Sequence, residues 1–122
     1  MNETTASRAS ILLVEDIGWL RSSMRRTLEG YGFNVFEASD ADEAIRVAAC
    51  VRPDLILTEE QLPTFRALEQ RVREHPELSS VPIVIVNPDA AEGARYGDAF
   101  VLTDFAHLGR LVHHPADTRT DF

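Results

Sequence analysis

The sequence contains no lysine and only one cysteine in its 122 residues. All twelve basic residues are therefore arginines, and the twenty acidic residues set a formal net charge of −8. A surface of that sign repels phosphate backbones and anionic lipid headgroups, so we expect no nucleic-acid partner and no membrane partner. The single cysteine, Cys50, cannot form an internal disulfide, which is typical of a protein in the reducing cytoplasm.

Long apolar runs and the usual enzyme motifs are also absent. No run approaches the about 20 apolar residues of a membrane-spanning helix, and residues 1–10 lack the apolar segment of a secretory signal. The sequence has no nucleophile elbow, no phosphate-cradling glycine loop and no histidine and cysteine spacing of a closed zinc site. We therefore expect a cytoplasmic protein with no enzymatic activity and no required cofactor.

The chain instead alternates short apolar segments with segments of helical periodicity. The expected strands are 11–14, 33–36, 55–58, 83–86 and 100–102. The expected helices are 17–29, from a cap at Ser39 or Asp40 to Ala49, 65–74 and 104–112. Such alternation specifies a parallel sheet with helices on both faces, the doubly wound α/β class. We expect one domain over residues 10–113, a flexible leader over 1–9 and a polar tail over 114–122.

Polar side chains follow the carboxyl ends of the expected strands. Glu15 and Asp16 follow the first strand, and Glu59 ends the third. Asn87 follows the fourth strand and Thr103 the fifth. Ligands bind beyond these strand ends in doubly wound folds, so the topology places the five side chains on one edge. Carboxylates so close repel one another unless a cation or hydrogen bonds offset their charge, so the cluster is either a residual metal site or a solvated acidic rim.

Three segments, taken in order, resemble the receiver domain of bacterial two-component response regulators. They are Ile11-Leu12-Leu13-Val14-Glu15-Asp16, residues 52–63 with Pro53-Asp54-Leu55-Ile56-Leu57, and Val81-Pro82-Ile83-Val84-Ile85-Val86. The resemblance covers about residues 10–112. It implies a flavodoxin-like doubly wound sheet of five parallel strands in the order 2-1-3-4-5, here with shortened fourth and fifth helices.

The resemblance also implies roles for the residues at the strand ends. In the family, an acidic pair holds a magnesium ion beside the aspartate that accepts a phosphoryl group. Glu15 and Asp16 keep the pair, and the acceptor position is Glu59. The positions of the family's switch residues are Asn87, Phe100 and Thr103.

Several of these positions depart from the family pattern. Glu59 is one methylene longer than aspartate, so its oxygens overshoot the in-line geometry of phosphoryl transfer. Thr103 replaces the family's lysine, Asn87 replaces its serine or threonine, and Asp104 replaces its proline. The stretch between Asn87 and Phe100 is also short for the fourth helix. These departures indicate a degenerate pseudo-receiver.

We weigh three functions. The first is a phosphorylation-independent protein-interaction module in two-component signalling, which binds other signalling proteins, with a homodimer as one option. The second is a phosphorylatable receiver with altered chemistry at Glu59. The third is a module that binds a cation or a small ligand in the pocket of Glu15, Asp16 and Glu59, where magnesium would bind weakly. Glu59 either imitates a phosphorylated aspartate or reflects drift, and we favour drift.

Three further residues or segments carry expectations. Trp19 marks either an exposed partner contact or ordinary packing. Cys50 lies near alanines and an isoleucine of an expected helix, so we expect it to be buried. With the fourth helix stunted, we expect residues 88–97 to be mobile, and the neighbouring strands to support self-association or partner docking.

Overall fold

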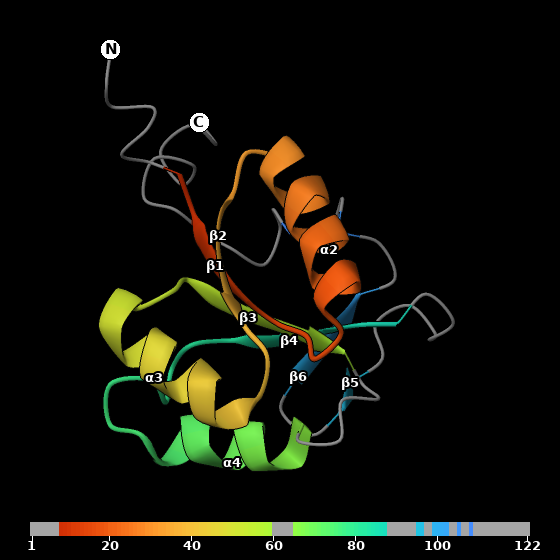
Figure 1. Cartoon of the computed structure of the whole chain (residues 1–122). Coiled ribbons are helices and arrows are strands. Elements are labelled where there is room, and N and C mark those ends of the chain that lie inside the picture. Colours follow the sequence, from red (N-terminus) through yellow and green to blue (C-terminus); the bar gives the residue numbers. More distant parts are fainter. Residues whose placement is uncertain are drawn as a thin grey trace.

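The computed structural model describes residues 8–59, 65–87, 95–96, 99–102, 105 and 108. Within them, nine helices and strands follow one another along the chain (Figure 1). They are β1 (Ser10–Val14), α2 (Gly18–Gly30), β2 (Asn34–Ala38), α3 (Ala41–Val51), β3 (Leu55–Glu59), α4 (Phe65–Glu74), β4 (Ile83–Val86), β5 (Arg95–Tyr96) and β6 (Ala99–Leu102). The bounds of α4 and β4 are those predicted, while α2 begins and ends one residue later than predicted.

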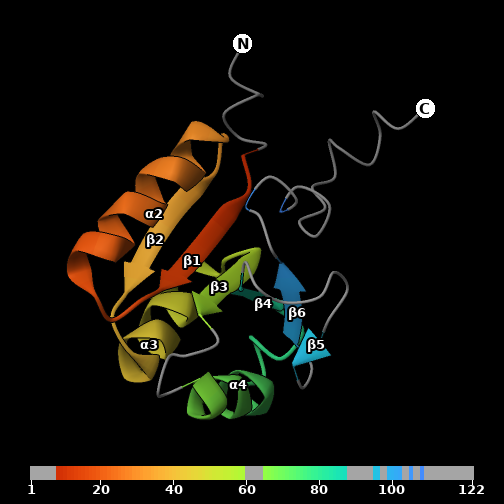
Figure 2. The ribbon, with the colours of Figure 1, turned by 90° about the vertical axis from the view of Figure 1, so that its right-hand side faces the viewer.

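The strands form one sheet in the order β2-β1-β3-β4-β6-β5 (Figure 2). The pairs from β2 through to β6 are parallel, and β5 pairs with β6 in the antiparallel sense. The sheet thus contains the short antiparallel edge strand β5, which was not predicted, beside the five parallel strands. A strand of two residues is too short to show an alternation of apolar and polar side chains, so the sequence pattern could not predict it.

Helices cover both faces of the sheet, which confirms the α/β class (Figure 1). Helix α2 lies on one face, over a core that includes Leu13, Leu28 and Leu57. Helices α3 and α4 lie on the other, over a core that includes Leu12, Ile56 and Leu68. Because neighbouring strand residues point to opposite faces, β1 contributes to both cores, and its residues Ile11–Val14 are fully buried.

The two ends of α3 show how local sequence sets a helix boundary. The Asp40 carboxylate accepts a hydrogen bond from the Glu43 amide at 2.8 Å, which confirms Asp40 as the N-cap. The Glu43 carboxylate in turn accepts hydrogen bonds from the Ser39 amide at 2.7 Å and from the Ser39 hydroxyl at 2.9 Å. At the other end, Arg52 adopts the left-handed region with φ 51°, directly before Pro53.

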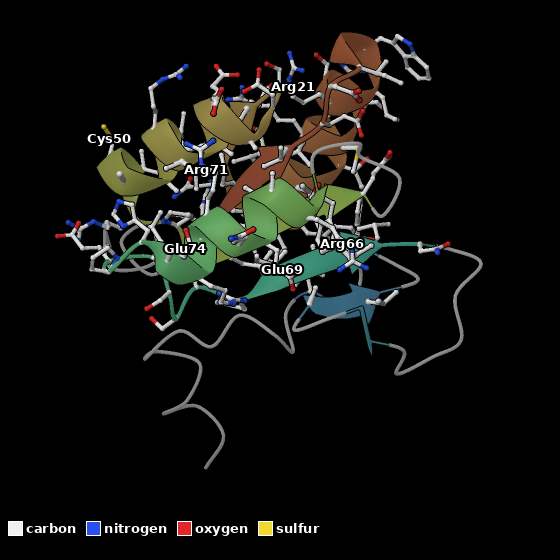
Figure 3. All side chains as sticks on the ribbon, turned by 90° about the horizontal axis from the view of Figure 1, so that it is seen from below. Arg21, Cys50, Arg66, Glu69, Arg71 and Glu74 are labelled. Carbon is white, nitrogen blue, oxygen red and sulfur yellow. The ribbon has the colours of Figure 1, made fainter. Side chains whose placement is uncertain are left out.

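The exposure of Cys50 and of Trp19 can be compared with what the sequence led us to expect. Cys50 is exposed, so the prediction of a buried cysteine was wrong. Figure 3 shows its sulfur at the outer end of α3, pointing away from the neighbouring elements. Trp19 is 75% exposed, which excludes the packing interpretation. In the described part of the chain, no helix is both long and apolar enough to cross a membrane.

Some expectations lie outside the described residues. They concern the leader and the tail, most of the segment 88–97, and the last helix over 104–112. Of the last helix only Phe105 and Leu108 are described, and Leu108 is fully buried in the core under α2.

Candidate functional site

The carboxyl ends of the central strands meet at one edge of the sheet. Val14 lies opposite Thr58 in the register of β1 and β3, and Glu59 lies opposite Val86 in that of β3 and β4. The residues that follow these positions, Glu15 and Asn87, therefore flank Glu59 on its two sides. The predicted edge is formed for these residues. Thr103 lies outside the described residues, and Phe100 is described only as a backbone position of β6, opposite Val84.

Glu15 is the buried member of the acidic cluster. Its side chain is 0% exposed, whereas Asp16 is exposed and Glu59 is partly buried. Glu15 Oε2 accepts a hydrogen bond of 2.9 Å from the Ile17 amide. Glu15 Oε1 has no hydrogen-bond partner within the described part of the chain. The interpretation as a solvated rim is therefore wrong for Glu15.

Burial raises the pKa of the Glu15 carboxyl from its ordinary value of 4.5 to about 7. The bond from the Ile17 amide lowers this pKa, while the neighbouring carboxylates of Asp16 and Glu59 raise it. A protonated Glu15 removes one of three neighbouring negative charges. The cluster thus reduces its repulsion by holding a proton in the folded state near neutral pH.

The carboxylates of Glu15, Asp16 and Glu59 are candidates for a metal site, since their oxygens are the ligands that a hard cation such as magnesium prefers. Within the residues that the structure describes, no three His, Cys, Asp or Glu side chains are arranged so that they could hold a metal ion. The predicted weak magnesium site therefore stays a prediction.

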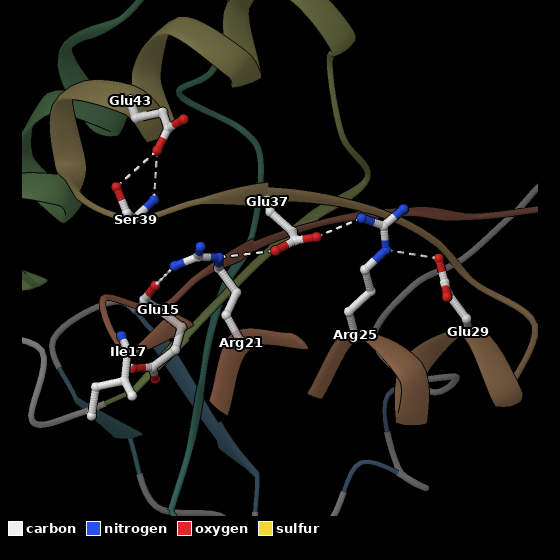
Figure 4. A network of polar contacts seen from close by, with 8 residues as sticks. All are labelled: Glu15, Ile17, Arg21, Arg25, Glu29, Glu37, Ser39 and Glu43. Atoms are coloured by element: carbon white, nitrogen blue, oxygen red, sulfur yellow. Dashed lines mark hydrogen bonds and ion pairs between the residues drawn. The ribbon is translucent and has the colours of Figure 1, made fainter. Parts of the chain in front are cut away.

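An ion-pair network connects this edge to α2 and β2 (Figure 4). Arg21 Nη1 donates to the Glu15 carbonyl oxygen at 2.7 Å, and Arg21 Nε donates to Glu37 Oε1 at 2.9 Å. Arg25 binds the other oxygen of Glu37 at 2.5 Å and Glu29 Oε2 at 2.9 Å. The bonds from Arg25 and then Arg21 hold the pKa of Glu37 below its ordinary value.

None of Arg21, Arg25 and Glu37 was singled out from the sequence. The spacing of Arg21 and Arg25, four residues apart, was a signal that both side chains lie on one face of α2. Their partner Glu37 lies on another element, 16 and 12 residues away along the chain. No periodicity in the sequence connects the three.

A second buried polar group lies at the same end of the sheet. Thr58, the residue before Glu59, is 0% exposed, and its hydroxyl has no hydrogen-bond partner among the described residues. Its register partners are Val14 on β1 and Ile85 on β4, both fully buried. The hydroxyl is therefore enclosed by apolar neighbours on both sides.

Comparisons with known proteins identify relatives of this chain. The chain is 34% identical to the KDP operon transcriptional regulatory protein KdpE of Escherichia coli over 83 residues, which is 68% of this chain and 36% of KdpE. It is 31% identical to the polar-differentiation response regulator DivK of Brucella anthropi over 86 residues, 69% of this chain and 70% of DivK. The chain thus spans only about a third of KdpE but most of DivK.

A solved structure agrees with these relatives. The receiver domain of the sensor histidine kinase PA1611 from Pseudomonas aeruginosa was solved with a magnesium ion coordinated in its active site cleft. It superposes with a TM-score of 0.67 at 26% identity, over 86% of this chain and 94% of that one, which supports the flavodoxin-like receiver fold. The profile of the response regulator receiver domain matches residues 11–98. The chain therefore belongs to the response regulator receiver domain family of two-component signalling.

Proposed function

We propose that this receiver domain works by binding other signalling proteins without being phosphorylated, and that it has no catalytic activity of its own. The observation that carries the proposal is the pair of carboxyl groups at the strand ends. A glutamate, Glu59, occupies the acceptor position, and beside it Glu15 is buried and bonded to the Ile17 amide. The proposal places the protein in the cytoplasm, with histidine kinases or other receivers as candidate partners.

The chemistry of the pocket supports the absence of phosphoryl transfer. In-line attack requires a carboxylate oxygen at a fixed distance from the donor, and the extra methylene of Glu59 displaces that oxygen. The transferred group brings further negative charge to an edge that already holds three acids. With no lysine in the sequence, no ammonium group is present to offset that charge.

The surface next to the pocket supports a binding function. Trp19 and Ile17 are 75% and 44% exposed at the start of α2. Exposed tryptophan side chains are enriched among the residues that contribute most to protein–protein affinity. Trp19 lies three residues after Asp16 along the chain, in the first turn of α2.

Intact-mass measurement tests the proposal. The protein is incubated with acetyl phosphate and magnesium, beside a phosphorylatable receiver as a positive control. We expect the mass of this chain to stay unchanged while the control gains one phosphoryl group. A stoichiometric phosphoryl adduct that disappears in Glu59→Gln would instead establish a phosphorylatable receiver with altered chemistry.

A cation-binding module is the second candidate, and one observation favours it. Glu15 Oε1 is buried and has no hydrogen-bond partner among the described residues, so a bound cation could satisfy it. Because no three acids of the described residues are arranged to hold a metal ion, we expect magnesium to bind weakly. Titration of the fluorescence of Trp19, the only tryptophan, reports binding. Saturation at micromolar magnesium that is lost in Asp16→Asn would favour this candidate over the interaction module.

A further inference from the structure

Arg21 contacts two segments beside the acidic edge, the turn between β1 and α2 and the strand β2. Its Nη1 donates to the Glu15 carbonyl oxygen at 2.7 Å, and its Nε donates to Glu37 on β2 at 2.9 Å. Its backbone amide donates to the Ile17 carbonyl oxygen at 2.8 Å. One residue of the first turn of α2 thus holds the chain segment that carries Glu15 and Asp16 (Figure 4).

The anchor of this contact is itself fixed. Glu37 lies in β2, whose register with β1 places it opposite Leu13, two residues before Glu15. The second oxygen of Glu37 is bound by Arg25, so the carboxylate cannot turn away without losing another ion pair. The side chains of Arg21 and Glu37 are only 22% and 26% exposed, which limits screening of their charge by water. Hydrogen bonds between charged partners in such surroundings are stronger than neutral ones.

The backbone at the turn between β1 and α2 is held on its amide side by the bond of 3.0 Å from the Glu15 amide to the Ala38 carbonyl oxygen of β2, and on its carbonyl side by Arg21. Helix α2 begins after Ile17, which makes no side-chain cap, and its first turn contains no acidic residue. The Ile17 amide is instead bound by the Glu15 carboxylate. That bond requires the Glu15 side chain to bend along its own chain, and the direction of a side chain is set by the orientation of its backbone. Arg21 fixes that backbone at the Glu15 carbonyl.

We propose that Arg21 is a positioning residue of the acidic pocket, which holds the Glu15 carboxylate on the Ile17 amide by clamping the Glu15 backbone to Glu37. The inference goes beyond the proposed function, because it holds whether or not Glu59 accepts a phosphoryl group. Its consequence is that loss of the guanidinium frees the Glu15 carboxylate from the turn while the remainder of the fold stays in place.

Arg25 provides the matched control. It binds the same Glu37 carboxylate from the same helix, and its other ion pair is with Glu29, so among the described hydrogen bonds none joins it to Glu15. The variants Arg21→Gln and Arg25→Gln each remove one guanidinium and one ion pair to Glu37. Only Arg21→Gln also removes the bond to the Glu15 carbonyl oxygen.

Hydrogen exchange at single amides, measured by NMR at one fixed pH, tests the inference. The Ile17 amide reports the bond from the Glu15 carboxylate, and the Ile56 amide, bonded to the Pro82 carbonyl oxygen at 2.9 Å, reports global stability. In Arg21→Gln we expect exchange at the Ile17 amide, relative to exchange at the Ile56 amide, to become about tenfold faster, which corresponds to about 1.4 kcal/mol. In Arg25→Gln we expect the ratio of the exchange rate at the Ile17 amide to that at the Ile56 amide to stay within about twofold of its native value.

Equal changes in the two variants, or an unchanged ratio in Arg21→Gln, would overturn the inference. If Arg21→Gln does not fold, Glu37→Gln replaces it, because that variant removes the charge of the anchor and leaves Arg21 in place. Faster exchange at Ile17 than at Ile56 in Glu37→Gln then supports the clamp, and parallel changes at both amides refute it.

Discussion

Glu15 Oε2 accepts a hydrogen bond of 2.9 Å from the Ile17 amide, two residues further along the same chain. In the family that this chain belongs to, the first acid after β1 is expected to face a metal ion. Here the same carboxyl group is fully buried and satisfies a backbone amide before α2. A position associated with metal chemistry thus serves the local structure of the turn.

The first prediction concerns the pH dependence of stability. Because the pKa of Glu15 is about 7 in the folded protein against an ordinary 4.5, the native state holds a proton between these values that the unfolded chain releases. This contribution, roughly 3 kcal/mol, is fully present below pH 4.5 and is lost as the pH rises to about 7. We expect Glu15→Gln to flatten the pH profile in this window, measured by urea unfolding.

Glu43→Gln is the control for that profile. The bonds from the Ser39 amide and hydroxyl hold the pKa of Glu43 below its ordinary value, so its contribution has the opposite sign. It is present above the pKa of the unfolded chain and is lost only as the pH falls through the folded value. Because Glu43 takes no part in the contact between Arg21 and Glu15, Glu43→Gln should change the acidic limb and leave the slope toward neutral pH intact. An unchanged slope in Glu15→Gln would contradict the raised pKa of Glu15.

The second prediction concerns the buried hydroxyl of Thr58. Replacing it by a methyl group in Thr58→Val keeps the shape of the side chain and removes a polar atom without a described partner. We expect a gain of about 1 kcal/mol in the free energy of unfolding, measured by denaturant titration. Val14, opposite Thr58 and equally buried, offers the reciprocal change: Val14→Thr should lose about 1–3 kcal/mol. A loss in Thr58→Val would mean that the hydroxyl is hydrogen-bonded in solution.

The sequence predicted the elements whose patterns are local. Strand β4 is a continuous run of apolar residues, and α4 carries Leu68 and Val72 four residues apart, so both were located correctly. Cys50 was misplaced because the buried face of α3 passes through Ala44 and Ala48. A residue two positions after Ala48 lies on the opposite side of the helix, since each residue turns by about 100°.

The candidate site was predictable in its position but not in its internal bonding. Topology alone places the ends of β1 and β3 on one edge, and Glu15 and Glu59 are found there. The inward direction of the Glu15 side chain could not be foreseen, because it depends on its burial beside α2 and on the bond to Ile17. The ion pair of Arg21 with Glu37 joins α2 to β2. The periodicity of one helix or strand contains no information about such a pair with another element.

The third prediction concerns the left-handed backbone at Arg52. A residue with a Cβ at φ 51° is disfavoured, whereas glycine adopts this region freely. Arg52→Gly and Arg52→Ala both remove the exposed ion pair with Glu77, so their difference isolates the backbone. We expect the glycine variant to be more stable than the alanine variant by about 1 kcal/mol in thermal and urea unfolding. Equal stabilities would show that this position relaxes at no cost.

The last prediction concerns the acceptor position itself. Glu59→Asp shortens the side chain to the length that the family uses, but it adds no positive charge and leaves Asn87 in the place of a small hydroxyl residue. We therefore expect Glu59→Asp alone to remain unlabelled by acetyl phosphate and magnesium, as judged by intact mass. The triple variant Glu59→Asp, Asn87→Thr, Thr103→Lys restores length, hydroxyl and cation together, and we expect it to gain a phosphoryl group. Glu59→Gln in the same assay is the control for labelling elsewhere in the chain. If the single variant is labelled as completely as the triple one, the length of the acceptor was the limiting loss, and the missing lysine does not explain the lack of phosphorylation.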